Sequence, residues 1–321
     1  MKLLGPFFNL IRWPNLLFIA ITQCLFHFCV VEPSVNLGLN FPLHLFTRWF
    51  VLLCASSVFI AAGGYIINDY FDVNIDLVNK PNRVWIDKAI SRRWALVWHL
   101  GLSGTGVALG AIVSWQINNW LIAVANLACT ILLWTYSTTY KRRLLWGNVL
   151  ISALTAWVVL VLLVAEIPSW WTGRLNNPTD IQTAARLSRI GVVYAAFAFI
   201  ITLIREVVKD LEDMEGDRKE GCSTMPIVWG VPASKIFVAV WLVVLVVSLV
   251  VIEVYVLTFG GLAAWLAAVY LTAFLVVPLL RFFKQLGSAV TPQHYHSMST
   301  RLKYIMLAGI LSMVFFYTTA S

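Results

Sequence analysis

Long apolar stretches recur along the 321-residue sequence, and they limit it to a small set of folds. A helix that crosses a bilayer needs about 20 mostly apolar residues, and it satisfies its backbone hydrogen bonds internally. Residues 49–67 carry no charge, and Gly260 with Gly261 predicts a turn that divides another long run. We predict nine spans, over residues 14–33, 47–67, 95–115, 119–139, 147–166, 188–205, 234–257, 260–281 and 302–320.

Composition excludes the main alternatives to a membrane protein. Charged residues make up 12% of the chain and the hydrophobic set 60%, whereas a soluble domain typically has about 25% charged residues. The apolar runs are too long for the alternating strands of a membrane β-barrel. The five cysteines show no spacing typical of a disulfide framework or a zinc site. We therefore expect an all-α, multi-pass integral membrane protein.

The connections between the predicted spans alternate between those with many basic residues and those with few. All but four of the 23 Lys and Arg residues lie before the first span or in every second connection after it. The four on the opposite side are Arg48, Arg174, Arg186 and Arg189. Because cytoplasmic loops are enriched in Lys and Arg, we expect a cytoplasmic N-terminus and an external C-terminus, in the cell (inner) membrane. Topology thus explains the net charge of +8, and no nucleic-acid partner is predicted.

Acidic residues are concentrated after the second and sixth predicted spans. All but four of the 15 Asp and Glu residues lie in segments 69–87 and 206–220. The same spacing, i, i+3 and i+7, separates Asp69, Asp72 and Asp76 in the first segment and Asp210, Asp213 and Asp217 in the second. On helical continuations of the two spans, these positions share one face. We expect two carboxylate stripes, four spans apart, that face one cavity on the cytoplasmic side and form a weak internal repeat.

Such stripes require compensating cations, because like charges on one helix face repel each other. Carboxylates without nearby His or Cys favour Mg²⁺ over zinc or copper, and Mg²⁺ commonly binds one or two carboxylates together with substrate phosphates. Basic residues accompany both segments, at Arg83, Lys88, Lys209, Arg218 and Lys219. The pattern predicts a phosphate- or diphosphate-bearing ligand, bridged by Mg²⁺, whose hydrocarbon tail lies among the apolar helices.

These residues resemble the UbiA superfamily of intramembrane prenyltransferases, whose members have nine helices and aspartate-rich motifs after the second and sixth. The first motif here is Asn68-Asp69-x-x-Asp72-x-x-x-Asp76, and the second is Asp210-x-x-Asp213-x-x-x-Asp217. A third similarity is Tyr136-Ser137-x-x-Tyr140-Lys141-Arg142, followed by Gly147-Asn148. The resemblance covers essentially the whole chain and implies a single prenyltransferase domain over residues 1–321.

The resemblance also implies roles for individual residues. Mg²⁺, as two ions on the diphosphate of a prenyl diphosphate, would be held by Asp69, Asp72, Asp210 and Asp213. Substrate-binding positions would be Asn68, Asp76, Arg83, Tyr136, Lys209 and Asp217, together with Lys141. Of these, Lys141 and Arg83 would contact the diphosphate directly.

The implied activity is prenyl transfer through an allylic carbocation. Ionisation of the C–O bond releases diphosphate, whose charge Mg²⁺, Lys141 and Arg83 would stabilise. Aromatic faces attract cations, and Tyr136 and Tyr65 are the candidates near the motifs. An apolar cavity keeps water away from the cation until a lipophilic acceptor attacks it.

The motifs leave the acceptor open. Residues 205–217 are most similar to the branch of the family that forms digeranylgeranylglyceryl phosphate, with the chlorophyll synthase branch next. That similarity favours a lipid or alcohol, such as a glycerol-phosphate ether lipid, over the aromatic ring of a quinone precursor. A lyase that acts on a prenyl diphosphate without an acceptor is a further alternative.

An ion-coupled transporter is the alternative from another functional class. Transporters place ionisable groups near the bilayer midplane, whereas the predicted span interiors here are almost free of charge. His294 and His296 form a further candidate pair of metal ligands, in the predicted connection before the last span. Since no third ligand accompanies them, we interpret them as solvated loop residues.

Overall fold

The computed structural model describes residues 4–37, 45, 47–79, 81, 84–171 and 178–316. Within these ranges the chain is helical, apart from turns, short connections and one isolated bridge between Ile86 and Ile90. The elements are α1 (Leu4–Leu10), α2 (Trp13–Phe26), the π-helical turn η1 (His27–Val31), α3 (Glu32–Leu37), α4 (Thr47–Asn79), α5 (Arg92–Gln116), α6 (Trp120–Thr138), the 3₁₀ turn η3 (Tyr140–Arg142), α7 (Trp146–Trp171), α8 (Pro178–Lys219), α9 (Met225–Val228), α10 (Gly230–Leu257), α11 (Gly261–Leu271), the π-helical turn η4 (Thr272–Val276), α12 (Val277–Ser288) and α13 (Pro292–Leu311).

Nine helical segments in the described part of the chain are long and apolar enough to cross a membrane, which confirms the predicted number. They cover Trp13–Ser34, Thr47–Asn79, Arg92–Gln116, Trp120–Thr138, Trp146–Glu166, Ile181–Lys219, Gly230–Leu257, Gly261–Ser288 and Pro292–Phe316. The protein is therefore a multi-pass, all-α membrane protein.

Two spans are much longer than the apolar runs that predict them. α4 continues past position 67 to Asn79, and α8 continues past position 205 to Lys219. Both aspartate motifs are therefore helical, and the spacing i, i+3, i+7 places each on one helix face. α4 ends two residues before Pro81, which disfavours helical continuation. α8 ends two residues before Gly221, which adopts a left-handed φ of 69°.

The last helix begins one polar segment before position 302, where the last apolar span is predicted to start. α13 begins at Pro292, and the hydroxyl of Thr291 caps it by accepting a hydrogen bond from the His294 N–H at 3.4 Å. A helix can extend beyond the hydrocarbon when a cap and a proline at its first turn support its start. His294 and His296 are therefore helical, and His296 Nδ1 lies 2.8 Å from Glu212 Oε1 on α8.

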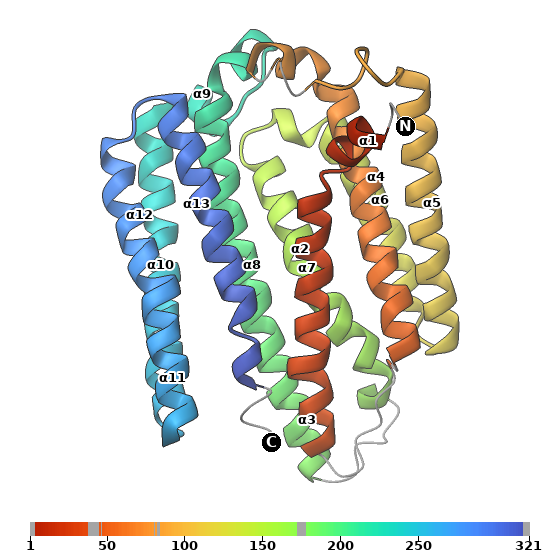
Figure 1. The fold of residues 1–321 in the computed structure, drawn as a ribbon, viewed down its shortest axis with the longest axis vertical. Helices are drawn as coiled ribbons and strands as arrows, with labels where there is room; N and C mark the ends of the chain where they lie inside the picture. The colour runs from red at the N-terminus through yellow and green to blue at the C-terminus, as the bar shows by residue number, and fades with distance from the viewer. Residues whose placement is uncertain are drawn as a thin grey trace.

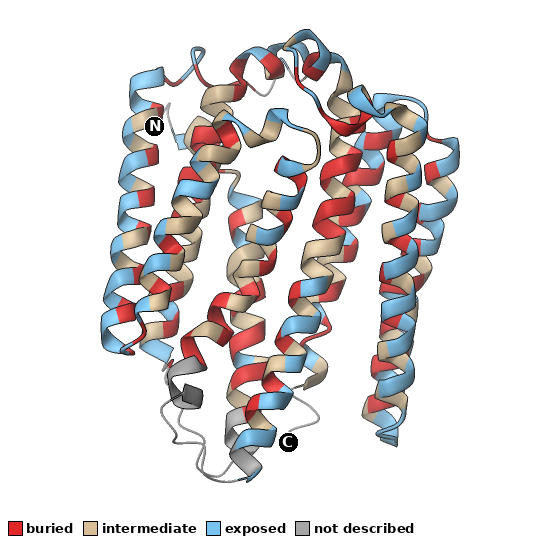
Figure 2. Ribbon diagram, turned by 180° about the vertical axis from the view of Figure 1, so that it is seen from behind, coloured by how far each residue is buried: buried red, intermediate tan, exposed pale blue. Residues whose placement is uncertain are grey.

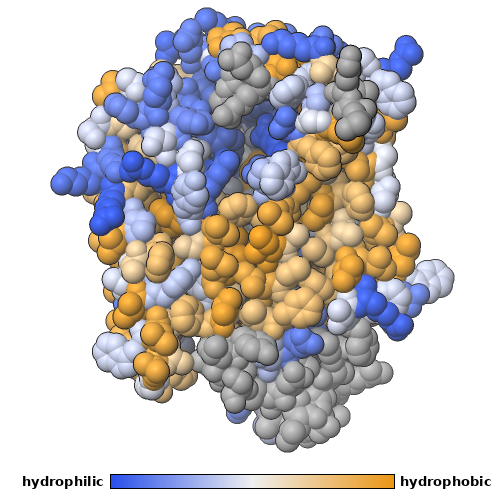
Figure 3. Space-filling view, viewed as in Figure 1, coloured by the Kyte–Doolittle hydropathy of each residue, from blue (hydrophilic) through white to orange (hydrophobic). Residues whose placement is uncertain are grey.

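The long helices run side by side between two ends of the molecule (Figure 1). One end carries α1, α9 and the C-terminal ends of α4 and α8, and we call it the polar end. Hydrophilic side chains gather there, above an apolar band over the helix shafts (Figure 3). Buried residues lie mainly on the inward sides of the helices (Figure 2), whereas apolar side chains such as Trp115 and Leu262 are 84% and 75% exposed on the outside.

Small residues let α4 and α5 approach closely, as is common between membrane helices. A Cβ atom at Gly63 of α4 would lie 2.2 Å from Ser103 Oγ, and one at Gly106 of α5 would lie 2.9 Å from the Ser56 carbonyl oxygen. Ser56 Oγ also donates to the Gly106 carbonyl oxygen at 2.6 Å. The shaft of α4 is thereby held firmly beneath the first aspartate motif.

Candidate active site

A cavity at the polar end gathers residues from all three sequence motifs. It encloses about 560 Å³, including the solvent at its mouth. Its lining residues are Ile75, Asp76, Tyr136, Lys141, Gly147, Asn148, Glu206, Lys209, Asp210, Asp213, Asp217, Cys222 and Thr224. The ends of α4, α6 and α8, the start of α7 and the turn η3 therefore meet around one polar space.

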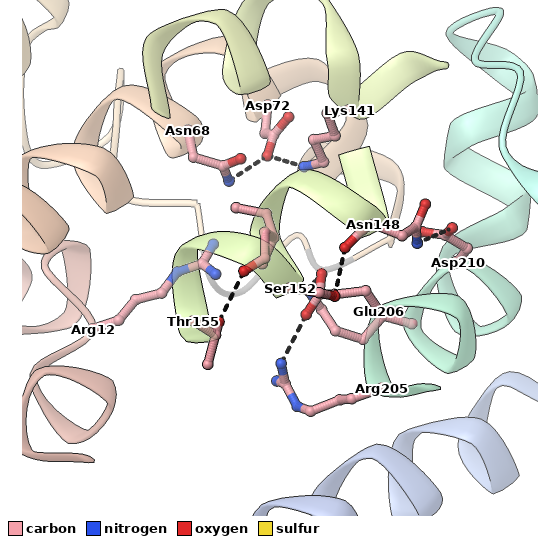
Figure 4. Close-up of polar contacts among 12 residues, drawn as sticks. Arg12, Asn68, Asp72, Lys141, Asn148, Ser152, Thr155, Arg205, Glu206 and Asp210 are labelled. Carbon is pink, nitrogen blue, oxygen red and sulfur yellow. Dashed lines mark hydrogen bonds and ion pairs between the residues drawn. The ribbon is translucent and has the colours of Figure 1, made fainter. Parts of the chain in front are cut away.

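Asp72 of the first motif is held at the edge of this cavity by two partners. Asn68 Nδ2 donates to Asp72 Oδ2 at 2.7 Å, and Lys141 Nζ forms an ion pair with the same carboxylate (Figure 4). Burial disfavours charge on Lys141, but Asp72, Tyr136 and Asp76 together outweigh that effect and raise the pKa of Lys141 above its ordinary value. Lys141 is therefore a positive charge that α4 and η3 hold in place.

Gly147 allows α7 to begin close to this lysine. A Cβ atom at Gly147 would lie 2.9 Å from both the Lys141 Cα and the Tyr140 carbonyl oxygen. Any larger residue would push the start of α7 away from η3. The glycine thus positions the next residue, Asn148, whose Nδ2 donates to Asp210 Oδ2 of the second motif at 2.8 Å.

Asp69 faces a different partner from Asp72. Its Oδ1 lies 2.6 Å from Nη2 of Arg12, which stands between α1 and α2. The guanidinium of Arg12 also lies over the ring of Tyr65, 5.4 Å from the ring centroid. Arg12 has a left-handed φ of 51°, which is uncommon for a residue other than glycine. Asp69 and Tyr65 are not among the residues that line the cavity.

Glu206, one turn before Asp210 on α8, lies between two cations. Its Oε1 accepts from Arg205 Nη1 and its Oε2 from Lys209 Nζ, each at 2.9 Å. The sequence motifs predict Lys209 as a site residue but indicate no role for Arg12, Asn148, Arg205 or Glu206. The position of Arg205 and Glu206, shortly before the second motif, could have indicated that they belong to the site. No sequence pattern near Arg12 indicates that it pairs with Asp69.

The sequence-predicted residues therefore fall into three groups. Those that line the cavity are Asp76, Tyr136, Lys141, Lys209, Asp210, Asp213 and Asp217. Asp72 pairs with Lys141, which lines the cavity, and Asn68 donates a hydrogen bond to Asp72. Asp69 forms an ion pair with Arg12 instead. Arg83 lies outside the described residues.

The donor set suits a hard cation that arrives with an anionic substrate. In the described part of the chain, no three His, Cys, Asp or Glu side chains form a ready-made metal site. Asn68 Oδ1, beside Asp72, is buried and accepts no hydrogen bond from the described residues. Mg²⁺ prefers oxygen ligands and takes several of them from water and phosphate. An acidic cavity that also contains Lys141 and Lys209 can thus bind a diphosphate together with Mg²⁺.

The sequence is similar to a known protein family and to relatives within it. The model of the UbiA prenyltransferase family matches residues 34–298. A digeranylgeranylglyceryl phosphate synthase of Methanosphaera stadtmanae is 30% identical over 267 residues, which cover 83% of this chain and 86% of that protein. Another, from Haloquadratum walsbyi, is 35% identical over 197 residues, or 61% of each chain.

Solved structures share the fold at lower sequence identity. A structure of digeranylgeranylglyceryl phosphate synthase has a TM-score of 0.62 and 22% identity, and the match covers 98% of both chains. A UbiA homologue from Aeropyrum pernix has a TM-score of 0.61 and 15% identity, and covers 92% of this chain and 98% of its own. Since the family model and the Methanosphaera relative both match most of the sequence, the chain belongs to the UbiA prenyltransferase family.

Proposed function

We propose that the chain transfers a prenyl group from a prenyl diphosphate to a hydroxyl of a glycerol-phosphate ether lipid. The observation that carries this proposal is the meeting of carboxylates from α4 and α8 with Lys141 in one cavity at the end of an apolar bundle. The relatives named digeranylgeranylglyceryl phosphate synthase support the acceptor. A glyceryl phosphate with two geranylgeranyl groups is formed when a singly prenylated one receives the second.

Mg²⁺ is the cofactor in this proposal. We assign Asp69, Asp72, Asp210 and Asp213 as the carboxylates that hold two ions on the diphosphate. Two related structures from Archaeoglobus fulgidus, bound to DMAPP or GPP together with Mg²⁺, support the use of this metal. When bound, Mg²⁺ withdraws electron density from the diphosphate oxygens and so stabilises the leaving group.

Residues of the chain then position the substrate and stabilise charge. Lys141, held by Asp72, faces the leaving diphosphate, and we assign Arg83 to the same group. Tyr136 lines the cavity beside Lys141 and presents an aromatic face to the allylic cation. The remaining substrate-binding positions are Asn68, Asp76, Lys209 and Asp217.

The proposed reaction balances without a further reactant. The bond between the first prenyl carbon and the diphosphate oxygen breaks, and its electron pair leaves with the diphosphate. A lone pair of the acceptor hydroxyl forms the new C–O ether bond, and the hydroxyl proton passes to the released diphosphate. The apolar helices below the cavity exclude water, which would otherwise quench the cation.

The proposal includes an orientation and a domain organisation. We place the polar end in the cytoplasm and the nine helices in the cell membrane, because the basic residues accumulate at that end. Residues 1–321 would act as a single domain, since the family match extends from the end of the first span into the last helix.

The test is product analysis of the purified protein. Protein in detergent is incubated with geranylgeranyl diphosphate, Mg²⁺ and one of three additions: a singly prenylated glycerol phosphate, an aromatic hydroxy acid, or no acceptor. We expect a doubly prenylated glycerol phosphate, identified by mass spectrometry, in the first reaction alone. A prenylated aromatic product, or a free prenol or cyclised hydrocarbon without acceptor, would overturn the proposed acceptor. Absence of diphosphate release in all three reactions would overturn the transferase activity.

A further inference from the structure

The charges on α8 form two neighbouring stripes of opposite sign. Glu206, Asp210, Asp213 and Asp217 follow one another at i, i+4, i+7 and i+11, whereas Arg205 and Lys209 occupy i and i+4 on the adjacent stripe. Along the axis of α8, both cations precede the three aspartates and therefore lie farther from the polar end. With a rise of 1.5 Å per residue, Arg205 lies about 7.5 Å deeper along α8 than Asp210.

Arg205 and Lys209 form a basic stripe whose two positive charges are balanced by only one carboxylate. Glu206 is shared by Arg205 and Lys209, each at 2.9 Å, while Asp210 is bound by the neutral amide of Asn148. Arg205 Nε is buried and donates to no acceptor among the described residues. Each of the two cations also has further N–H donors besides the one given to Glu206. Since burial of an unbalanced charge is costly, the stripe suits an anion.

Arg12 adds positive charge to the same region from another element. Figure 4 shows the guanidinium groups of Arg12, between α1 and α2, and of Arg205, on α8, directed toward the middle of the site. Only Asp69 pairs with Arg12 among the described ion pairs.

The site therefore has two parts with different requirements. Lys141 and Lys209 are the cations among the described lining residues of the cavity, and the carboxylates of Asp76, Asp210, Asp213 and Asp217 outnumber them, so the part around these aspartates repels an anion that brings no metal. The part around Arg205 and Lys209 attracts an anion directly. Two anionic substrates that must react together can occupy such a site without sharing cations.

We infer that Arg205 and Lys209 bind the phosphate of the acceptor lipid. This inference rests on the proposed function, because it names the group that recognises the proposed acceptor. The glycerol hydroxyl is only a few bonds from the phosphorus atom. A phosphate held between Lys209 and Arg205, about 1.5–7.5 Å below Asp210 along α8, therefore brings that hydroxyl close to the first prenyl carbon, which points from the diphosphate toward the apolar helices. Glu206 holds both cations in position before the acceptor arrives.

Arg205→Gln and Lys209→Gln test the inference, and each leaves Glu206 paired with the other cation. Lys219→Gln is the matched control, because Lys219 lies on the same helix and pairs with the exposed Glu215. Initial rates are measured with the singly prenylated glycerol phosphate and with the same lipid after removal of its phosphate. We expect both site variants to raise KM for the phosphorylated acceptor roughly 10- to 100-fold. For Arg205→Gln, KM for geranylgeranyl diphosphate and the rates with the dephosphorylated acceptor should stay near those of the wild type.

A binding measurement without prenyl diphosphate provides the second readout. A ligand that binds the folded state raises Tm, so the phosphorylated acceptor should raise Tm of the wild type and of Lys219→Gln more than the dephosphorylated lipid does. The site variants should lose that difference, and Arg205→Lys should retain part of it. Inorganic phosphate, added alone, separates binding of the head group from binding of the whole lipid.

Two results would overturn the inference. Arg205→Gln could raise KM for the prenyl diphosphate, which would assign that cation to the other substrate. The site variants could also weaken both acceptors equally, which would show a structural role. If the wild type forms no prenylated product, the proposed function fails, yet the Tm difference between the two lipids still decides whether these cations bind a phosphate.

Discussion

The side-chain amide of Asn79 joins the two aspartate motifs through the backbone around Gly216. Its Nδ2 donates to the Asp213 carbonyl oxygen at 3.0 Å, and its Oδ1 accepts from the Gly216 N–H at 2.9 Å. Asn79 is the last residue of α4, so these bonds hold the end of α4 against α8. A Cβ atom on Gly216 would lie 2.5 Å from Asn79 Nδ2, and this contact therefore requires glycine.

We expect Asn79→Ala and Gly216→Ala each to lower the free energy of unfolding by about 1–3 kcal/mol, through loss of the two hydrogen bonds. In the Asn79→Ala background, Gly216→Ala should instead be neutral or stabilising, because the clash is gone and alanine is the better helix former by about 1 kcal/mol. Unfolding of the four proteins in detergent forms a double-mutant cycle. An equal cost of Gly216→Ala in both backgrounds would contradict this account.

Lys141→Gln should lower kcat/KM by about 100-fold or more, as expected for the loss of a cation that stabilises a leaving group. It should also lower Tm, because Asp72, which is 3% exposed, loses its cation. The double variant Asp72→Asn/Lys141→Gln should regain much of the Tm but none of the activity. Recovery of both properties would show that the ion pair serves stability alone.

Removal of Mg²⁺ with a chelator should abolish diphosphate release, and added Mg²⁺ should restore it. We expect Asp213→Asn to raise the Mg²⁺ concentration needed for half-maximal turnover by at least about tenfold. Glu215→Gln is the matched control, since Glu215 is two residues away on α8, 78% exposed and paired with Lys219. A similar Mg²⁺ requirement in both variants would count against Asp213 as a ligand.

Single cysteines at the two ends of the bundle should react from opposite sides of the membrane. Glu215→Cys at the polar end should react with an impermeant maleimide in inside-out vesicles, and Phe259→Cys, at a position 70% exposed, in right-side-out vesicles. The unaltered protein is the control. Burial raises the pKa of its Cys222 to about 11, so that thiol stays protonated and unreactive near neutral pH. The reverse pattern would place the site outside the cell.

Much of the fold could be predicted from the sequence, because a membrane span is a local property. Hydropathy over about 20 residues identifies a span, and the nine segments appear where they are predicted. The start of α13 is the exception, since polar residues such as His294 form helix once Thr291 caps them. Hydropathy detects the hydrocarbon boundary, and that boundary differs from the end of a helix.

Some features of the candidate site could likewise be predicted from local sequence patterns, whereas others depend on how the helices pack. The i, i+3, i+7 spacing predicts that Asp210, Asp213 and Asp217 share a face, and all three line the cavity. Spacing does not reveal that Asp69 pairs with Arg12, 57 positions earlier, or that Asn148 binds Asp210, 62 positions later. Asp69 and Asp72 look equivalent in the motif, yet they face different cations.

By itself, the sequence determined the class of protein, the number of spans and the two carboxylate stripes, because hydropathy and the helical period act between neighbouring residues. Only the tertiary structure decided that Asp69 meets Arg12, that Asp72 meets Lys141 and that Asn148 binds Asp210. A side chain's face on its helix follows from the helical repeat, but its partner depends on which helices pack together and at what depth.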